Sequence, residues 1–143
     1  MPTHSEKRKV PHTRRQMFDL VADIEKYPEF LPWCLSLRIN DKEGDDIIAD
    51  MVIGYKMFRE KFRSKVELIG ENQINVTYED GPFKFLKNTW LFHEEEDGSC
   101  VIDFFIEFEF KSKFLENMIG AVFTDAVKIM VQAFEKRAAL IYK

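Results

Sequence analysis

The sequence contains few of the residues that build disulfide frameworks, metal clusters or membrane spans. Its 143 residues include two cysteines, Cys34 and Cys100, and three histidines, and these do not show the close spacing of a metal site. No run of about 18 apolar residues is present, so the sequence predicts no membrane-spanning segment. Residues 1–9 lack the apolar stretch of a secretory signal, which favours a cytoplasmic protein or one peripheral to the inner membrane.

Catalytic motifs are also scarce. The sequence has no phosphate-binding glycine loop, no dinucleotide-binding fingerprint and no Gly-x-Ser-x-Gly turn. A formal net charge of −4 argues against broad, non-specific nucleic-acid binding. We therefore expect a non-enzymatic protein with no catalytic residues, no metal and no cofactor. A lyase or cyclase that needs only one or two polar groups in an apolar cavity stays open as an alternative.

Phenylalanine is the residue that the sequence has in excess, with 14 copies. Its side chain supplies a large apolar volume without a hydrogen-bonding group. With 45% hydrophobic and 32% charged residues, the chain has the composition of a globular protein. At this length we expect one domain, residues 1–143, with an extensive hydrophobic core.

The segment Tyr27–Cys34 concentrates two prolines, three aromatic residues, a leucine and a cysteine. Pro28 and Pro32 fix their own φ and push the preceding residue towards an extended conformation, so the segment cannot be one continuous helix. It is also too apolar for an ordinary solvated loop. We predict a rigid, non-helical corner against an apolar surface, either a plug of the core or the rim of a ligand cavity.

Hydrophobic periodicity predicts the elements on both sides of this corner. A short strand at residues 6–12 precedes a helix of about three turns, which Thr13 and Gln16 begin as a capping box. From residue 35 to residue 111 the period changes to two, as in strands with one buried face. Because these strands follow one another without crossover helices, we expect an antiparallel sheet.

The last part of the chain, Phe114–Tyr142, has the pattern of one long helix of roughly 40 Å. Gly120 lies inside it, either at a point of close packing or at a hinge. The predicted fold class is therefore α+β, with a curved antiparallel sheet around a long C-terminal helix. Since one helix cannot cover the whole apolar face of such a sheet, we expect a hydrophobic cavity between them.

Three polar residues fall on faces that are otherwise apolar. Asn88 lies between Leu86 and Trp90, Ser64 points inward from an earlier strand, and Arg137 is on the apolar side of the last helix. A buried amide must find hydrogen-bond partners or lose a few kcal/mol. These residues are either satisfied core groups or the polar end of a site for a largely apolar ligand, such as a quinone.

A basic run occupies one strand, with Lys61, Arg63 and Lys65 at alternate positions. One interpretation is a solvated sheet face balanced by Glu60 and Glu67. The other is a patch that contacts lipid phosphates or ribosomal RNA.

Several segments, in order along nearly the whole chain, resemble a known family. The resemblance lies in Phe18–Ile24, Tyr27–Cys34, Phe62–Ser64, Gly81–Phe83, Leu86–Phe92, Phe108–Ser112 and Phe134–Ala138. These segments are similar to the coenzyme-Q-binding START-domain proteins, relatives of the polyketide cyclase/dehydrase group and of the bacterial ribosome-association toxin. Eukaryotic members carry a mitochondrial targeting segment; this chain begins almost at its first predicted strand, as in a bacterial member or a processed form.

The resemblance implies a helix-grip fold, in which the sheet grips the C-terminal helix around a lipid-sized cavity. It further implies non-catalytic binding of ubiquinone, or a similar isoprenoid lipid, in support of respiratory electron transport, with transient contact to a membrane surface. The alternative that the resemblance allows is a toxin-like protein that binds the large ribosomal subunit and blocks subunit joining through the basic strand. An aromatase/cyclase-like enzyme is a third hypothesis.

For the quinone hypothesis we predict a polar head near the corner or near Asn88, a tail along the last strand and the last helix, and a membrane-facing gate at residues 114–120. The predicted cavity and entrance residues are Phe30, Leu31, Trp33, Ser64, Asn88, Trp90, Phe104, Ile106, Phe108, Leu115, Met118, Phe123, Val127 and Met130.

Overall fold

The structure is a computed structural model that describes residues 3–31, 33–55 and 58–142. Pro32 of the predicted corner lies outside the described residues. The elements in chain order are β1 (Thr3–Val10), α1 (Arg14–Ala22), the 3-10 helix η1 (Ile24–Glu29), β2 (Cys34–Glu43), β3 (Asp46–Tyr55), β4 (Phe58–Ile69), β5 (Gln73–Asp80), β6 (Phe83–Glu94), β7 (Cys100–Phe110) and α2 (Lys113–Ile141).

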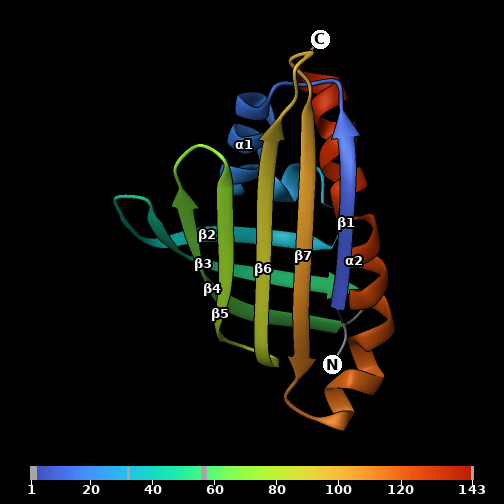
Figure 1. The fold of residues 1–143 in the computed structure, drawn as a ribbon. Coiled ribbons are helices and arrows are strands. Elements are labelled where there is room, and N and C mark those ends of the chain that lie inside the picture. Colours follow the sequence, from blue (N-terminus) through green and yellow to red (C-terminus); the bar gives the residue numbers. More distant parts are fainter. Residues whose placement is uncertain (1–2, 32, 56–57, 143) are drawn as a thin grey trace.

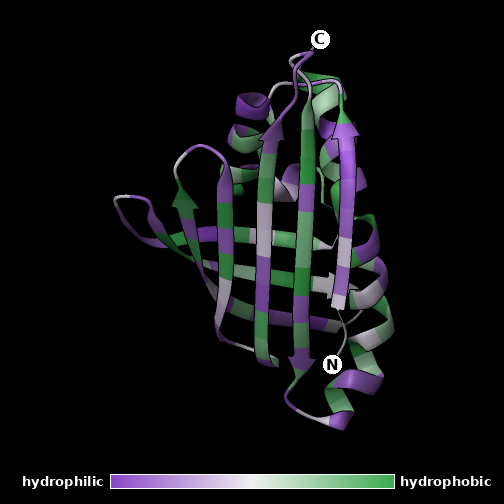
Figure 2. Ribbon diagram, viewed as in Figure 1, coloured by the Kyte–Doolittle hydropathy of each residue, from purple (hydrophilic) through white to green (hydrophobic). Residues whose placement is uncertain are grey.

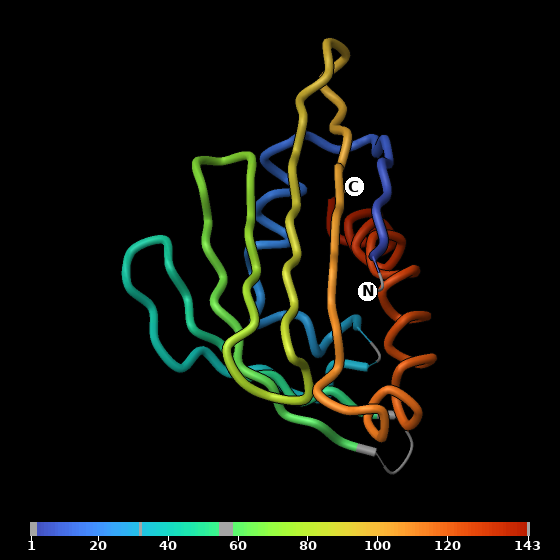
Figure 3. Tube along the Cα trace, turned by 60° about the horizontal axis from the view of Figure 1, so that its bottom comes forward, coloured from blue at the N-terminus to red at the C-terminus, as the bar shows by residue number. Residues whose placement is uncertain are grey.

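The strands form one antiparallel sheet of seven strands in the order β1-β7-β6-β5-β4-β3-β2. The sheet curves so strongly that β2, β3 and β4 cross behind β5, β6 and β7 (Figure 1). Both helices lie on the concave side of the sheet (Figures 1 and 3), with α1 against β5–β7 and α2 against β7 and β1. The predicted α+β class and helix-grip architecture are confirmed.

The strands alternate between apolar and polar residues along their length (Figure 2). On β7 the inward set predicted from period two is buried, from Cys100 and Ile102 at 0% exposure to Phe110 at 9%. Asp103 and Glu107 on the opposite face are only half-buried. A shift of one residue would exchange the two faces, so this alternation fixes the register of the sheet.

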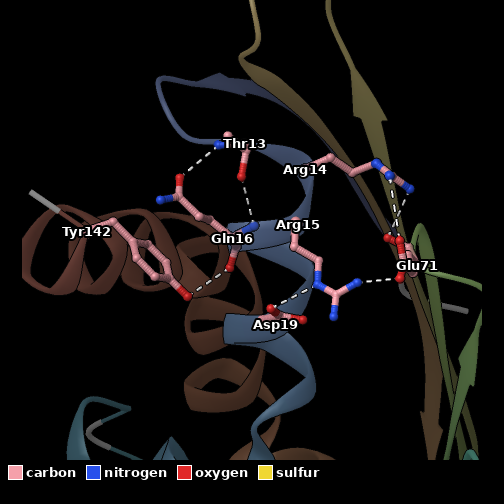
Figure 4. A network of polar contacts seen from close by, with 7 residues as sticks. All are labelled: Thr13, Arg14, Arg15, Gln16, Asp19, Glu71 and Tyr142. Atoms are coloured by element: carbon pink, nitrogen blue, oxygen red, sulfur yellow. Dashed lines mark hydrogen bonds and ion pairs between the residues drawn. The ribbon is translucent and has the colours of Figure 1, made fainter.

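Helix α1 begins as the sequence predicts. The Thr13 hydroxyl accepts a hydrogen bond from the Gln16 N–H at 3.0 Å, and the Gln16 side chain accepts one from the Thr13 N–H at 3.0 Å. Around it, Arg15 pairs with Asp19 and Glu71, and the Tyr142 hydroxyl donates to the Gln16 carbonyl (Figure 4). These contacts connect α1 to the β4–β5 turn and to the end of α2. Strand β1 starts three residues earlier than predicted, at Thr3.

The prediction of a non-helical corner is wrong for its first part, because η1 extends to Glu29. Pro28 has no N–H to donate, but the residues on either side of it supply the turns: Lys26 donates to Asp23 at 3.2 Å and Phe30 to Tyr27 at 3.2 Å. The chain then turns into β2. The helix α1 and the short 3-10 helix η1 therefore follow each other in place of one continuous helix.

Helix α2 has 29 residues and runs without interruption through Gly120, so this glycine is not a break in the helix. A Cβ at Gly120 would lie at ordinary contact distance from Phe110, 3.8 Å, which leaves room for a larger residue. Ser112 caps the helix, its hydroxyl accepting from Leu115 N–H at 3.2 Å. Among the described helices, none is both long and apolar enough to cross a membrane.

Candidate ligand cavity

A cavity lies where α2 leaves the sheet uncovered. The helix packs mainly on β7 and β1, so the inner faces of β3 to β6 meet the corner and the middle of α2 across a gap. The gap holds about 800 Å³ of atom-free space, part of it open to solvent. Its lining is Ile24, Tyr27, Leu31, Trp33, Leu37, Ala49, Met51, Ile53, Phe62, Ser64, Val66, Ile74, Val76, Leu86, Asn88, Trp90, Ile106, Phe123, Met130 and Phe134.

The cavity approaches the surface between the corner and α2. Trp33, Ile53 and Phe123 line both the cavity and a second hollow, which Gly54, Ile119, Val122 and Ala126 complete and whose atom-free space of about 370 Å³ includes open solvent. The Gly54 N–H donates to the Trp33 carbonyl at 3.0 Å, which holds the corner against the end of β3. We call this opening, formed by the seven residues of the second hollow, the mouth.

Asn88 is the central polar group of the lining, and its side chain is 7% exposed. Its Nδ2 donates to the Phe105 carbonyl at 2.8 Å, and its Oδ1 accepts from the Trp90 Nε1 at 2.9 Å. These two partners fix the orientation of the amide, because a flipped amide would face a donor with a donor and an acceptor with an acceptor. The prediction that Asn88 points inward is confirmed.

Aromatic rings hold the walls in place. The Trp90 ring lies edge-on to Phe104 at 4.7 Å between centroids and to Phe134 at 5.1 Å. Phe134 also meets Tyr27 at 5.2 Å and Phe30 at 5.1 Å, so it joins β6 to the corner. Such edge-to-face pairs add about 1 kcal/mol each beyond the burial of their area.

The corner carries one titratable group of the lining, Tyr27. Its hydroxyl donates to the Val21 carbonyl, and burial raises its pKa far above the usual value. Outside the cavity, Arg137 stands over the Phe30 ring at 5.2 Å and pairs with Glu29 at 2.8 Å. Arg137 thus belongs to the outer surface of the corner, which answers the question of whether it faces the cavity.

Comparison with known proteins identifies this architecture. Residues 10–135 match the family described as polyketide cyclase / dehydrase and lipid transport. The chain belongs to this family.

Relatives within the family carry two different names. The ribosome association toxin RatA of Rickettsia prowazekii is 40% identical over 138 residues, which cover 94% of each chain. The coenzyme Q-binding protein COQ10 homolog B of Xenopus laevis, a mitochondrial protein, is 32% identical over 97% of this chain and 59% of its own length.

Solved structures extend the likeness of fold. A START superfamily protein from Mycobacterium smegmatis superposes with a TM-score of 0.83 at 17% identity, over 97% of this chain and 98% of that one. The ZhuI aromatase/cyclase from a Streptomyces species superposes with a TM-score of 0.84 at 12% identity, over 96% of this chain and 93% of that one. This chain therefore shares its fold with a START superfamily protein and with an aromatase/cyclase.

The structure brings together a large part of the residues predicted for the family's cavity. Those that line it are Leu31, Trp33, Ser64, Asn88, Trp90, Ile106, Phe123 and Met130. Those that lie elsewhere are Phe30, Phe104, Phe108, Leu115, Met118 and Val127. Phe104, Phe108 and Val127 are each at most 2% exposed, since they lie where α2 packs directly on the sheet, and Met118 is 52% exposed at the surface. Of the predicted tail path, Ile106, Phe123 and Met130 thus line the cavity, whereas Phe104, Phe108 and Val127 are packed in the core.

Other residues of the lining are not among those predicted for the site. Ala49, Phe62 and Val76 lie on the inward positions of strands whose alternation was recognised, and Tyr27 is part of the corner. The period of two therefore predicts that the side chains of these strand residues point inward. Which inward residues face the cavity and which face α2 depends on the path of the helix, which periodicity does not specify.

The basic run lies on the convex side of the sheet. Arg63 donates to Asp50 at 2.7 Å and 3.1 Å, and Asn40 donates to the same carboxylate at 3.1 Å. These hydrogen bonds lower the pKa of Asp50, whose side chain is 6% exposed. Arg63 is therefore largely neutralised, whereas Lys61 is exposed next to Asp80. Among the described residues no cluster of side chains is suited to hold a metal ion.

Proposed function

We propose that the protein binds a prenylquinone, with ubiquinone the expected ligand, in the cavity without converting it chemically. The single observation that supports this most strongly is the lining, which is apolar apart from Tyr27, Ser64, Asn88 and the indoles of Trp33 and Trp90. Burial of apolar surface contributes about 25 cal/mol per Å², so an isoprenoid lipid gains affinity from such walls without any charge. In the cell, this activity would support respiratory electron transport through transient contact with a membrane.

The absence of acid–base groups in the described lining supports a binding role over an enzymatic one. Its one titratable side chain is Tyr27, which is already bonded to Val21 and whose pKa is raised by burial. General acid–base catalysis needs a group whose pKa lies near the working pH and which can reach the substrate. We therefore propose that the ligand leaves the cavity unchanged.

Extraction of lipids from the purified protein, followed by mass spectrometry, tests this proposal directly. We expect a prenylquinone to co-purify in a fixed ratio to protein. The matched control is Ala49→Leu, since Ala49 is 3% exposed and lines the cavity, so a larger side chain there occupies ligand space. The variant should fold and lose the lipid. Recovery of no quinone from the unaltered protein would refute the proposal.

Ribosome association is the second candidate function. It is favoured by the 40% identity to the ribosome association toxin RatA over 94% of both chains. For this role the exposed Lys61 and the half-buried Lys65 are better candidates than Arg63, which Asp50 holds. We expect the double variant Lys61→Glu/Lys65→Glu to lose sedimentation with the large ribosomal subunit if this function applies.

The two candidates separate cleanly because they use opposite faces of the sheet. Ala49→Leu should abolish quinone binding and leave any ribosome sedimentation unchanged. The lysine variant should do the reverse. A protein that sediments with the large subunit and carries no quinone would favour the toxin-like role.

A further inference from the structure

Three of the polar side chains that line the cavity, Tyr27, Asn88 and Trp90, already have hydrogen-bond partners inside the protein. The Tyr27 hydroxyl is bonded to Val21, and the Trp90 Nε1 to Asn88. Away from the mouth, where the Trp33 indole lies, two side chains keep a free hydrogen-bond donor. After its bonds to Phe105 and Trp90, the Asn88 amide retains one N–H and one lone pair, since an amide can make four hydrogen bonds.

Ser64 is the second group with free capacity. Its side chain is 5% exposed and lines the cavity, and its hydroxyl forms no hydrogen bond with any described residue. In the sheet Ser64 pairs with Tyr78 of β5, and Asn88 pairs with Val76 of the same strand. Only β5 therefore separates Ser64 from Asn88, and both lie on the concave face.

The polar pair lies away from the mouth, since Ser64 and Asn88 are each the middle one of the three lining residues that β4 and β6 contribute. Ser64 is directly opposite Ala49 on β3, and Ile53 of the mouth is four residues further along that strand. At about 3.4 Å per residue this places the mouth about 14 Å from the Ser64 level. The rest of the lining between them is apolar. A ligand with one polar and one apolar end therefore binds most favourably with its polar end at Ser64 and Asn88 and its apolar end towards the mouth.

We infer that the cavity orients its ligand, with an oxygen-bearing ring seated against Ser64 and Asn88 and an apolar tail directed to the mouth. This inference rests on the proposed function and decides between the two head-group positions open from the sequence. Ser64 donates to a ring oxygen, and Asn88 offers its remaining N–H. Trp90 is a positioning residue, because its indole N–H fixes the Asn88 amide without reaching the ligand's oxygen itself.

Two probes of equal chain length test the role of Ser64: decylubiquinone, whose ring carries oxygens, and decylbenzene, whose ring carries none. One neutral hydrogen bond contributes about 1 kcal/mol net, so Ser64→Ala should weaken decylubiquinone binding about fivefold and leave decylbenzene binding unchanged. Folding should be unaffected, because the hydroxyl has no partner in the described protein. The matched control is Val66→Ala, a neighbouring lining residue whose truncation should weaken both probes alike.

Tryptophan fluorescence tests the orientation, because a quinone ring quenches an indole that it touches. The sequence has two tryptophans, so Trp33→Phe leaves Trp90 at the inner end, and the difference between this variant and the unaltered protein reports Trp33 at the mouth. Decylubiquinone should quench Trp90 strongly and Trp33 weakly.

The outcomes distinguish the inference from the function beneath it. If the quinone binds but Ser64→Ala weakens both probes equally, or if Trp33 is the more strongly quenched, the orientation is wrong and quinone binding stands. If decylubiquinone does not bind to the unaltered protein, both the inference and the proposed function fail.

Discussion

Gly81, in the turn between β5 and β6, is the position at which a single added methyl group should do most damage. Its φ is +143°, a conformation that only glycine adopts readily. A Cβ built on it would lie 2.5 Å from the Cβ of Phe62 and 2.9 Å from the Lys61 carbonyl oxygen. These atoms belong to the backbone and Cβ of β4, so they cannot move aside as the end of a flexible side chain would.

The cost of Gly81→Ala has two parts. The backbone conformation costs a residue other than glycine about 1–3 kcal/mol, and overpacking adds about 1–3 kcal/mol. Together we expect a loss of about 4 kcal/mol in the free energy of unfolding, a large share of the 5–15 kcal/mol typical of a domain. The turn also leads directly into Phe83, which is 0% exposed and stacks on Phe110 at 4.9 Å, so the core beyond the cavity would loosen with it.

Gly44→Ala is the matched control, because Gly44 also has a positive φ, +62°, but nothing lies within 4 Å of its built Cβ. It should cost only the backbone part, about 1–2 kcal/mol. Urea denaturation followed by tryptophan fluorescence gives both values, and thermal midpoints should fall by about 15 °C for Gly81→Ala and by about 5 °C for Gly44→Ala. Equal losses in the two variants would refute the steric argument.

Three further predictions address charge, membrane contact and thiol chemistry. Asp50→Asn should lower the free energy of unfolding at pH 7. The gap to the unaltered protein should narrow as the pH falls below 3.8, because a lowered carboxyl pKa stabilises the fold only while the group is ionised. A gap in acid titrations that does not narrow at all below pH 3.8 would contradict this. Met118→Glu should slow quinone transfer from vesicles while changing the free energy of unfolding by less than about 0.5 kcal/mol, since Met118 is 52% exposed. Leu115→Glu, at a half-buried position, should impair both transfer and stability. An equal loss of stability in the two variants would show that both side chains belong to the core. Burial raises the pKa of Cys34 and Cys100 to about 11, so a thiol reagent at pH 8 should label neither in the folded protein and both in urea.

The elements of the fold could be read from the sequence because each has a local physical cause. The capping box at Thr13 depends on two side chains three residues apart, and the inward set of β7 depends on a period of two. The strand ends were less accurate, since β1 begins at Thr3 instead of residue 6, where a polar edge strand gives little hydrophobic signal. The 3-10 helix at Ile24–Glu29 was missed because proline arguments exclude a long helix but permit one short turn.

The candidate site could be predicted only in part. Asn88 and Ser64 were found because a polar residue on an apolar face is visible in the sequence. Phe104 and Phe108 were placed on the tail path, yet both are in the closed core. Both groups belong to the same alternating pattern, so the pattern alone cannot distinguish residues that line the cavity from residues that are packed in the core.

The antiparallel sheet, its buried face, the long last helix and the apolar corner can be predicted from the amino-acid sequence, since all of these follow from spacing and backbone chemistry within a few residues. The position of the cavity depends on tertiary packing. The helix crosses the curved sheet over β7 and β1 and leaves β3 to β6 facing the corner, and that path is set by contacts such as those of Phe134 with Trp90 and Tyr27. These residues are far apart in the chain, and their meeting depends on packing, which no local pattern encodes.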